Sequence, residues 1–564
     1  MEDLKQTVAE AVSPGMCTGC SACVNSCPKK ALSFKKDRFG YFVPDIDIEK
    51  CNRCGLCVNL CPAIKLPARS NSDNPSLYAF IARDENLLQK SSSGAAFGVM
   101  AAHMLSQGGA VSGCAWSEDW NKSLSNVDSE RAQNDVSSSS NTGIGPLSSK
   151  ISPVAEHIIV DNEADLQKLH KSKYFQSYMG SVFSEISHLL KLGRRVLFCG
   201  CPCQVAGLRA FLRKDYDGLI CVDLLCGNAP SQSFFIKYVK ESFQEIPASY
   251  EFRNKTSGSW ATHTVKVGFK NESYSVIERN ADLFQKAYHK HIMTPPHCER
   301  CKYQTIPRYG DITIGDFWGI SKHDPQFNCQ KGVSLILVNN NKGKSFFESL
   351  PNDVIDYLEE KPLEWLGKNG CALKGCHNWS YPGRSRFYLS YSSGKSFEKS
   401  LDEALKLPND DDISRLVQGS VFYFDSINGS NFRFSPDDWE EHHIYKDVYL
   451  FAKRKESPIR RYAWLSFKSK LTKDTRYRVF VKFKVSTLSN IVNFHIMDMI
   501  TKKNQLIYSY HVEDFSSENY VIKEFVFDAN FDYDCFMIAA SQIKGEDPWI
   551  AFSKILIIKD EDFY

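Results

Sequence analysis

Eight cysteines near the start of the chain carry the clearest chemical signal, because they form two copies of one spacing. Each copy reads C-x2-C-x2-C-x3-C-P, with Cys17, Cys20, Cys23 and Cys27 in the first and Cys51, Cys54, Cys57 and Cys61 in the second. This is the bacterial two-cluster ferredoxin spacing, in which three thiolates hold one [4Fe-4S] cube and the fourth crosses to the other. One cube is assigned to Cys17, Cys20, Cys23 and Cys61, and the other to Cys51, Cys54, Cys57 and Cys27. A pair of zinc sites is the alternative, but zinc takes ligands in two pairs rather than three plus one.

A second group of cysteines lies in the middle of the chain: Cys199, Cys201 and Cys203 in LFCGCPCQVAGLRAFL, Cys226 in VDLLCG, and Cys298 and Cys301 in HCERCKY. A strand end followed by a helix from Gln204 presents thiols at a sheet edge, where backbone N–H groups stabilise negative sulfur. We expect a third [4Fe-4S] cluster held by Cys203, Cys226, Cys298 and Cys301. A zinc site and unrelated buried cysteines are the alternatives.

Two further blocks combine hydroxyl groups with lysines, as anion sites do. Lys90, Ser91, Ser92, Ser93 and Gly94 precede a helix predicted from Ala95, and a helix N-terminus attracts phosphate. An ordinary serine N-cap is the alternative for this block. The second block has Lys171, Ser172, Lys173 and Gln176, with Tyr174 available to pack on a ring.

Two residues are candidates for catalysis. Asp316 ends the predicted strand in DITIGDFWG, where a carboxylate could shape a pocket, although acidic turn residues are usually local caps. His297 lies next to Cys298 and could donate protons, as could His289 or His291, although a lone histidine is more often a packed side chain.

The helices and strands that must position these residues predict a multidomain chain of the α+β class. Strands are predicted over 77–83, 110–116, 157–160, 194–199 and 219–225, with helices over 95–107, 182–192 and 204–211, giving an α/β region with a mixed sheet. Residues 120–153, rich in Ser and Asn, are expected to be a mobile surface excursion. We divide the chain into a ferredoxin-like module (1–75), which should hold both cubes independently, two halves of a reductase domain (76–230 and 231–409) and a C-terminal domain (410–564).

The C-terminal domain contains short, aromatic, alternating runs separated by Asn, Asp, Gly and Ser turns, such as YRVFVKFKV and QLIYSYHV. This pattern is typical of an antiparallel β-sandwich, a fold that often binds carbohydrate or partner proteins. The aromatic candidates for a sugar platform are Trp439, Trp464 and Trp549, although core packing explains most aromatic residues better.

Composition excludes several classes of function. The 564 residues carry a formal charge of only +3, so neither nucleic acid nor an anionic membrane is indicated as a partner. Thiolate ligands must stay reduced, which places twenty cysteines in a cytoplasmic compartment. No run of 18 apolar residues and no signal-like N-terminus occurs, so neither a membrane span nor export is expected.

Several blocks follow one another in a characteristic order: the double cysteine repeat, KSSSGAAF, QGGAVSGCAW, KSKYFQS, VLFCGCPCQVAGLRAFL, VDLLCG, HCERCKY, and DITIGDFWGI with KGVSLILVN. Over roughly Cys17 to Phe347 the chain resembles the β subunits of coenzyme F-420 hydrogenases and dehydrogenases, with their ferredoxin-dependent flavoprotein relatives. The resemblance implies FAD beside a [4Fe-4S] cluster, contacted by residues 90–94 and 171–176. It also implies that Gly200, Pro202 and Gln204 lie near the isoalloxazine ring.

Two positions depart from the family pattern. Cys226-Gly227-Asn228 stands where members often have Cys-His-Gly, so the contribution of that histidine is missing or comes from elsewhere. Cys199 and Cys201 stand where Ser or Thr is common, which leaves surplus thiols near the third cluster.

The leading hypothesis is an iron–sulfur flavoenzyme that passes electrons from reduced ferredoxin or a similar low-potential donor through the clusters to FAD. An organic substrate would then be reduced, and the occurrence of bacterial relatives with polysaccharide biosynthesis enzymes suggests a nucleotide sugar or glycan precursor. The second hypothesis is an electron-transfer subunit serving a separate oxidoreductase. A third hypothesis is a binding module in which the clusters have only a structural role. The presence of three expected cluster sites makes this hypothesis the least favoured.

Overall fold

The protein is described by a computed structural model that divides into two compact units. Unit 1 comprises residues 1–379 and 396–398, and unit 2 comprises residues 380–395 and 399–564. The residues that the structure describes are 6–13, 15–118, 120, 153–256, 259–327, 331–366, 373, 383–406, 420–425, 432–434, 439–444, 447–452, 461–485, 489–498, 501, 503–511, 521–543 and 549–559. Most of the excursion expected over 120–153 lies outside them, as do Cys329, Cys371 and Cys376.

The N-terminal module of unit 1 is built from short elements around the cysteine repeats: α1 (Val8–Ala11), α2 (Ala22–Ser26), β1 (Leu32–Lys36), β2 (Phe42–Ile46) and α3 (Leu56–Asn59), with β1 and β2 antiparallel. The internal repeat is visible in the backbone, because Ser21 and Gly55, each directly after a cysteine, both take a positive φ (71° and 75°) before their helices. The two cysteine repeats therefore enter their short helices through the same left-handed turn.

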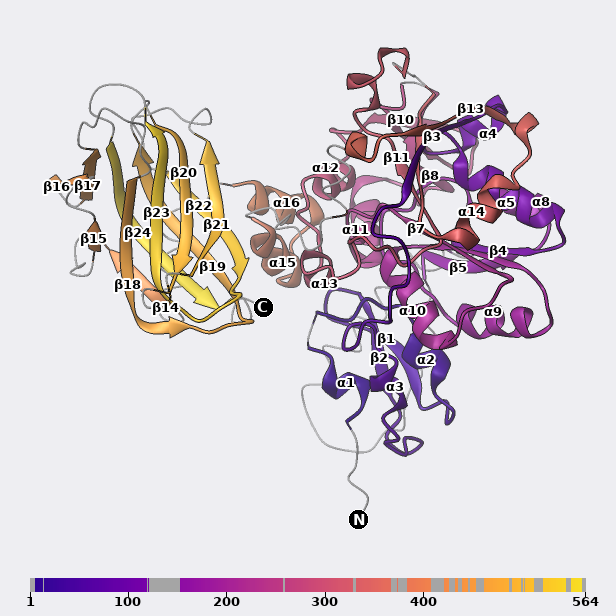
Figure 1. Ribbon diagram of the computed structural model, residues 1–564, viewed down its shortest axis with the longest axis horizontal. Helices are drawn as coiled ribbons and strands as arrows, with labels where there is room; N and C mark the ends of the chain where they lie inside the picture. Colours follow the sequence, from indigo (N-terminus) through magenta and orange to yellow (C-terminus); the bar gives the residue numbers. More distant parts are fainter. Residues whose placement is uncertain are drawn as a thin grey trace. The chain divides into compact units, whose positions relative to one another are not determined.

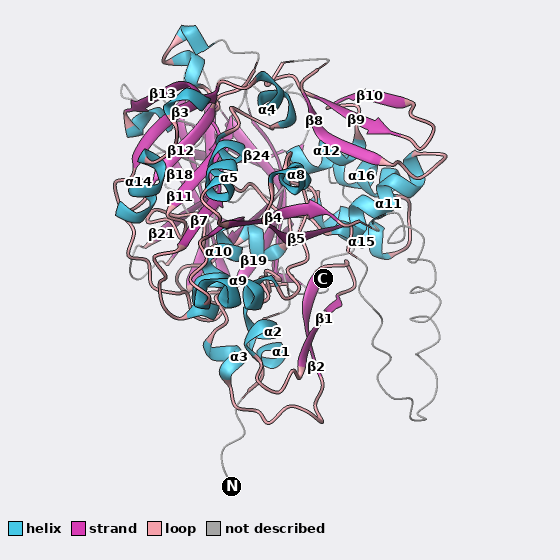
Figure 2. Cartoon of the chain, turned by 90° about the vertical axis from the view of Figure 1, so that its right-hand side faces the viewer, coloured by secondary structure: helices cyan, strands magenta, loops and turns pink. Residues whose placement is uncertain are grey.

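An eight-stranded mixed sheet forms the centre of unit 1 (Figures 1 and 2). Its strand order is β13 (Ile355–Lys361), β3 (Ser76–Ala82), β12 (Ser334–Val338), β11 (Ile312–Asp316), β7 (Leu219–Leu224), β6 (Val196–Gly200), β4 (Ala110–Trp116) and β5 (Ala155–Val160). The four strands β4, β6, β7 and β11 are mutually parallel, and the flanking strands are antiparallel to their neighbours. The carboxyl ends of the parallel strands therefore meet at one edge.

Helices cover both faces of this sheet. The helices in this part of unit 1 are α4 (Glu85–Lys90), α5 (Ala96–Ser106), α8 (Glu163–Leu166), α9 (Val182–Lys191), α10 (Pro202–Leu212), α11 (Gln232–Ser242), α12 (Leu283–His289), α13 (Pro296–Glu299) and α14 (Asn341–Glu348). Figure 2 shows α4, α5 and α8 on one side of β4 and β5, and α9 and α10 on the other. A smaller antiparallel sheet orders β10 (Tyr274–Glu278), β9 (Thr264–Gly268) and β8 (Ser249–Asn254).

Two hydrophobic cores result from the alternation of side chains along the central strands. Leu197 and Ile220 belong to the core beneath α5, whereas Val196, Phe198 and Leu219 belong to the core beneath α9 and α10. Successive strand residues point to opposite faces, so strands covered on both faces must be continuously apolar. The expected elements around the cysteines coincide with β3, α5, β4, β5, α9, β6, α10 and β7.

Unit 2 contains two antiparallel sheets (Figure 1). One orders β16 (Trp439–Ile444), β17 (Asp447–Ala452), β24 (Trp549–Lys559), β19 (Arg476–Val485) and β22 (Val521–Asp528), with β14 (Ser420–Asp425) also paired to β24. The other orders β15 (Phe432–Phe434), β18 (Arg461–Leu471), β23 (Tyr533–Ile543), β20 (Ser489–Met497) and β21 (Asn504–His511). The Phe494 ring of the second sheet lies 5.3 Å from the Phe483 ring of the first. The side chains of Trp439, Trp464, Trp549 and Cys535 lie outside the described residues.

Two helices precede these sheets, α15 (Arg384–Ser392) and α16 (Phe397–Leu405). None of the helices among the described residues is long and apolar enough to cross a membrane.

Candidate functional site: three cysteine sets and a large cavity

The eight N-terminal cysteines separate into an outer and an inner set. Cys27, Cys51, Cys54 and Cys57 line one small cavity of the module, and we name them the outer set. The inner set is Cys17, Cys20, Cys23 and Cys61. This division follows the crossed assignment expected from the spacing, in which the last cysteine of each repeat joins the other copy.

The inner set is the more buried of the two. Cys20, Cys23 and Cys61 are each 8% exposed, and burial raises the pKa of Cys17 to about 12 and that of Cys20 to about 11. Thiols in such surroundings ionise only when a cationic centre compensates their charge.

The middle cysteines form a third set at the carboxyl edge of the central sheet. One cavity is lined by Cys201, Cys203, Cys226, Cys298 and Cys301. Cys201 and Cys203 lie at the start of α10, Cys226 follows β7, and Cys298 lies in α13. The cavity thus includes the four expected ligands and a fifth thiol, Cys201, which is hydrogen-bonded to Cys226. Cys199 instead lines a different, larger cavity.

None of the three sets converges as tightly as a single-ion site requires. Among the described residues, no group of three or more His, Cys, Asp or Glu side chains could hold one metal ion. Thiolates around a [4Fe-4S] cube each bind a different iron and therefore stand farther apart than the ligands of one zinc ion.

The inner and third sets are neighbours across α10. A Cβ atom added at Gly207 would lie 2.9 Å from the Cys20 sulfur, so this glycine permits the close approach of module and helix. Tyr303, which is 3% exposed, lies between the two sets, and Cys20, Cys203, Cys61 and Cys301 all contribute to the rise of its pKa after burial, the main cause.

A cavity of about 300 Å³ opens beside the third set and shares Cys201, Cys226 and Gln204 with it. Both predicted anion blocks line this cavity, and they meet: the Ser92 and Ser172 hydroxyls are 2.9 Å apart, and the Ser172 backbone N–H donates to Ser92 Oγ at 3.1 Å. The expected site residues that line it are Ser91, Ser92, Ser93, Lys171, Ser172, Lys173, Tyr174, Gly200, Gln204 and Asp316.

The end of the cavity near α5 is electropositive. Both ring nitrogens of His170 are buried and have no hydrogen-bond partner among the residues that the structure describes. Burial, followed by the charges of Lys173, Lys90 and Lys171, lowers the pKa of His170 to about 4. The Lys173 ammonium donates to the carbonyl oxygens of Cys114 (2.9 Å) and His170 (2.8 Å), and burial lowers its pKa to about 8. Lys171 pairs with Glu251.

The opposite wall contains Arg253, which the sequence did not single out. Its guanidinium is 2% exposed and donates through Nη1 to Asp316 Oδ2 at 2.5 Å, and Trp260 Nε1 donates to the other carboxylate oxygen at 2.7 Å. Within the described part of the chain, Arg253 Nε has no hydrogen-bond partner. Asp316 therefore positions Arg253, and both of its oxygens are engaged. An isolated arginine in a strand pattern carries no local signal of such a role.

Asn228 is a second buried group with an unsatisfied atom at this cavity. It is 5% exposed, its Oδ1 has no hydrogen-bond partner in the described ranges, and its side-chain nitrogen lies 3.1 Å from His291 Nδ1. A histidine thus stands beside the position where the resembled family often has one in its Cys-His-Gly block. The Tyr288 and Tyr174 rings, 4.6 Å apart, complete this wall.

A hydrogen-bonded chain fixes the turn between β6 and α10. The Cys201 N–H donates to Gln204 Oε1 (2.8 Å), Gln204 Nε2 donates to Ser177 Oγ (2.9 Å), and Ser177 Oγ lies 2.8 Å from His157 Nδ1. His157 Nε2 donates to the Cys199 carbonyl at 3.1 Å. Burial lowers the pKa of His157 to about 4, which keeps the ring neutral near pH 7.

Five expected site residues do not line the large cavity. Lys90 is exposed at the end of α4, and Gly94 does not line the cavity: a Cβ there would lie 2.6 Å from the Ser334 nitrogen, so close strand packing requires the glycine. Gln176 bonds the module, accepting from the Phe42 N–H (2.9 Å) and donating to the Thr18 carbonyl (3.1 Å). Pro202 begins α10 and lines the cysteine cavity. His297 also lines that cavity and donates to the Gly15 carbonyl at 3.2 Å.

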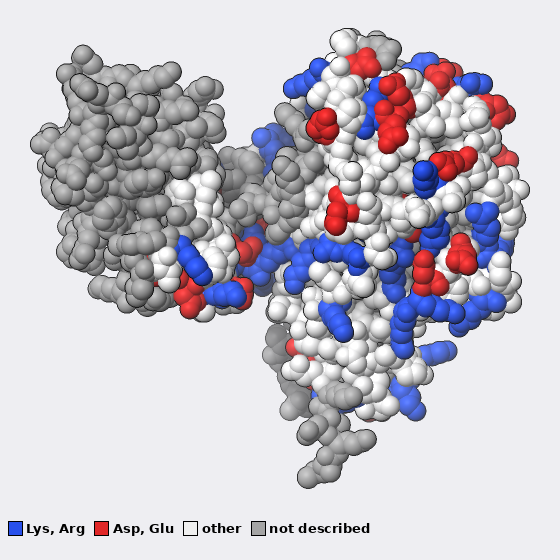
Figure 3. Space-filling view, in the orientation of Figure 1, with Lys and Arg blue, Asp and Glu red and all other residues white. Residues whose placement is uncertain are grey.

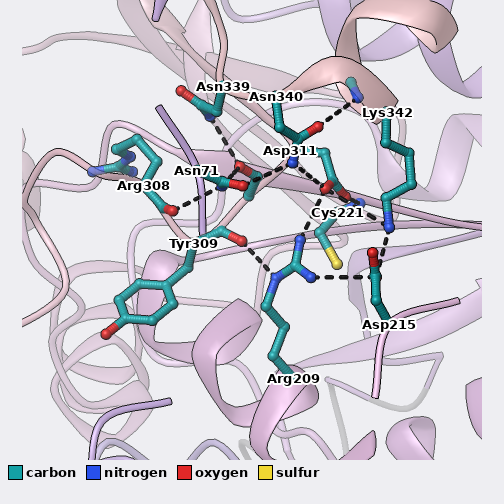
Figure 4. Close-up of polar contacts among 12 residues, drawn as sticks. Asn71, Arg209, Asp215, Cys221, Arg308, Tyr309, Asp311, Asn339, Asn340 and Lys342 are labelled. Atoms are coloured by element: carbon teal, nitrogen blue, oxygen red, sulfur yellow. Dashed lines mark hydrogen bonds and ion pairs between the residues drawn. The ribbon is translucent and has the colours of Figure 1, made fainter. Parts of the chain in front are cut away.

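Asp311, from the same block as Asp316, is a structural hub (Figure 4). Its Oδ1 accepts from Arg209 of α10 at 3.0 Å and from Asn340 at 2.7 Å, and its Oδ2 accepts from the Cys221 N–H at 2.7 Å. This network ties the helix that carries Cys203 to the sheet.

Two family models match the chain. Residues 193–364 match the model for the C terminus of the coenzyme F420 hydrogenase/dehydrogenase beta subunit. Over these residues the chain is therefore similar to that family. Residues 16–64 match a 4Fe-4S dicluster domain, so the resemblance stated from the sequence is confirmed.

Solved structures that are similar to this chain each cover only part of it. A chain of the F420-reducing [NiFe] hydrogenase complex from Methanosarcina barkeri is 14% identical, covers 62% of this chain and 92% of its own, and gives a TM-score of 0.31. A family 29 carbohydrate-binding module from Piromyces equi is 12% identical, covers 24% of this chain and 89% of its own, and gives a TM-score of 0.19. No curated protein matches the chain.

Proposed function

We propose that this chain is an iron–sulfur flavoprotein oxidoreductase that takes electrons from reduced ferredoxin or a similar donor through three [4Fe-4S] clusters to FAD. The observation that carries the proposal is the shared wall of two cavities, because Cys201, Cys226 and Gln204 line both the cysteine cavity and the larger one. A redox ring in the large cavity would lie next to a cluster in the small one.

The large cavity is lined by buried polar atoms that lack hydrogen-bond partners, and a bound flavin dinucleotide could supply those partners. The buried His170 nitrogens, Arg253 Nε and Asn228 Oδ1 have no hydrogen-bond partners among the described residues, and buried polar atoms are normally satisfied. Ser92, Ser172 and the α5 N-terminus would hold the pyrophosphate, with His170 donating a hydrogen bond. At the other wall Arg253 would donate to a ring oxygen, and Tyr174 and Tyr288 would exclude water. Bound FAD would supply the conversion from single electrons to hydride transfer.

We propose that the acceptor is an organic compound, in particular a nucleotide sugar or glycan precursor. Residues 410–564 would form a β-sandwich that binds the saccharide or a partner enzyme, as their strand pattern suggests. Because reduced thiolates are required throughout, we place the protein in the cytoplasm.

Anaerobic purification with iron and flavin counting tests the cofactor set. We expect about twelve irons, from three cubes, and one FAD per chain. About eight irons, as two cubes require, with no released flavin would contradict the proposal.

The second candidate is an electron-transfer subunit without a substrate site, which the match to a β subunit of hydrogenases and dehydrogenases favours. The two candidates differ in whether the reduced protein alone turns over a nucleotide sugar. Turnover with no second protein supports the enzyme, and turnover only after adding a partner oxidoreductase supports the subunit.

A further inference from the structure

The two N-terminal cysteine sets differ in their access to solvent. Cys54 of the outer set is exposed, whereas each of the other fifteen cysteines with described surroundings is buried or partly buried. The inner set faces α10 and Tyr303 instead. Any protein that delivers electrons from solution therefore reaches the outer set first.

The surface around Cys54 is basic. Lys29 and Arg53 line the same cavity as the four outer cysteines, and Lys30 follows on the chain. Residues 6–67 contain eight basic and five acidic side chains. In Figure 3, the part of unit 1 formed by the module shows more blue than red side chains on the visible face.

The charge at this surface is only partly compensated. Arg53 pairs with Glu10 at 2.9 Å, and Lys50 pairs with Asp47 at 2.6 Å. Lys29 and Lys30 are both exposed, and within the part of the chain that the structure describes neither has an ion-pair partner. Two lysines without an ion-pair partner among the described residues thus follow Cys27 and Pro28, and Cys27 is the crossing ligand expected for the outer cube.

We propose that Lys29, Lys30, Arg53 and Cys54 form a docking surface, here named the entry surface, for an acidic, low-potential [4Fe-4S] ferredoxin. This inference rests on the proposed function and adds where its donor binds. Opposite charges on two proteins speed their association, and this attraction weakens as the salt concentration rises. The donor would pass one electron to the outer cube, oxidising its own cluster by one electron, and no proton or bond change is needed.

The test uses the full-length holoprotein and two reductants. The protein is reduced anaerobically by an acidic two-cluster ferredoxin and, separately, by reduced methyl viologen, a small cation. The rate of each reaction is measured from the change in absorbance of the clusters. Lys29→Glu with Lys30→Glu should lower the second-order rate with ferredoxin by about tenfold or more at low ionic strength, and should flatten its salt dependence. Iron content and the rate with methyl viologen should not fall.

Two further variants make the outcome specific. Lys29→Gln with Lys30→Gln should give a smaller loss, which separates lost attraction from added repulsion. Lys191→Glu with Lys270→Glu makes the same charge change at two exposed lysines outside the module and should react as the wild type does. An unchanged ferredoxin rate in the Lys29/Lys30 variants, or an equal loss in the control, would overturn the entry surface. The rate of cluster reduction depends on neither flavin nor substrate. A failure of the entry surface can therefore be told apart from a failure of flavin binding or substrate turnover.

Discussion

At the scale of single residues, the cysteine cavity contains five thiols for the four ligand positions of a cluster, so one of them is not a ligand. Burial raises the pKa of Cys203, and Cys226, Cys301 and Cys298 add to this rise, whereas Cys201 lines both cavities and is hydrogen-bonded to Cys226. We expect Cys203→Ser to lose about four irons, one cube, while Cys201→Ser keeps its iron. Iron counting and electron paramagnetic resonance of the reduced protein check this, with Cys199→Ser as the control. The reverse result would make Cys201 the ligand.

The serine pair of the large cavity predicts where phosphate binds. Ser92→Asp places a negative charge beside Ser172 and the start of α5, where attraction to phosphate would become repulsion. Retention of FAD should fall at least tenfold with iron unchanged, as measured by flavin release on dilution. Ser106→Asp at the far end of α5 is the matched control and should keep its flavin. Full retention in Ser92→Asp would place the phosphate site elsewhere.

The buried His157 predicts a pH dependence of stability. Its pKa is lowered from 6.5 to about 4 by burial, so between those values the unfolded chain binds more protons than the folded one. Stability should therefore fall as pH drops from about 6.5 towards 4, by up to about 3 kcal/mol from this residue. Thermal melting at pH 7.0 and 5.0 should show a smaller acid loss in His157→Gln than in the wild type. Equal losses would assign the effect to other groups.

At the scale of elements, α10 is the structural link between the module and the reductase domain. It carries Cys203 at its start, packs Gly207 on Cys20 and is held by Arg209 on Asp311. Gly207→Ala would bring a methyl group within 2.9 Å of the Cys20 sulfur. Overpacking of this kind costs about 1–3 kcal/mol.

We expect Gly207→Ala to lower the melting temperature of unit 1 and to slow electron transfer from the N-terminal clusters to the third one. Rapid-mixing reduction, with separate spectra for the clusters and bound flavin, measures the second effect. Gly218→Ala is the control, since its added Cβ would meet no atom closer than 3.6 Å. Wild-type rates in Gly207→Ala would mean that the inner and third sets exchange electrons by another route.

At the scale of the whole molecule, the docking of the module changes an expectation drawn from the sequence. All eight thiolates lie within residues 17–61, which suggests a module that holds both cubes alone. In the structure, Cys20 belongs to the core formed by α9 and α10, and Ser21 donates to the Gly180 carbonyl at 2.9 Å. A fragment of residues 1–76 would expose the inner set to water and oxygen. We expect it to keep about four irons, one cube, and to lose the other on exposure to air. Retention of both would show that the module is autonomous.

The sequence by itself determined the features that depend on spacing and on period. The two cysteine repeats, the strands and helices around the third set and the two lysine–serine blocks could be read because thiolate ligation and side-chain alternation leave local patterns. The family resemblance came from such ordered blocks and is confirmed.

Only the tertiary structure decided which distant residues meet. Parallel strands β6, β7 and β11 bring Cys201, Cys226 and Asp316 to one sheet edge, although more than one hundred residues separate the first from the last. Arg253 and Asn228 are candidate ligand-binding residues because each has a buried polar atom without a hydrogen-bond partner among the described residues. No local sequence pattern predicts such an atom. For the same reason Gln176 and His297 proved to be contacts of the module rather than lining of the large cavity, because long-range docking, not local sequence, sets what a polar side chain touches.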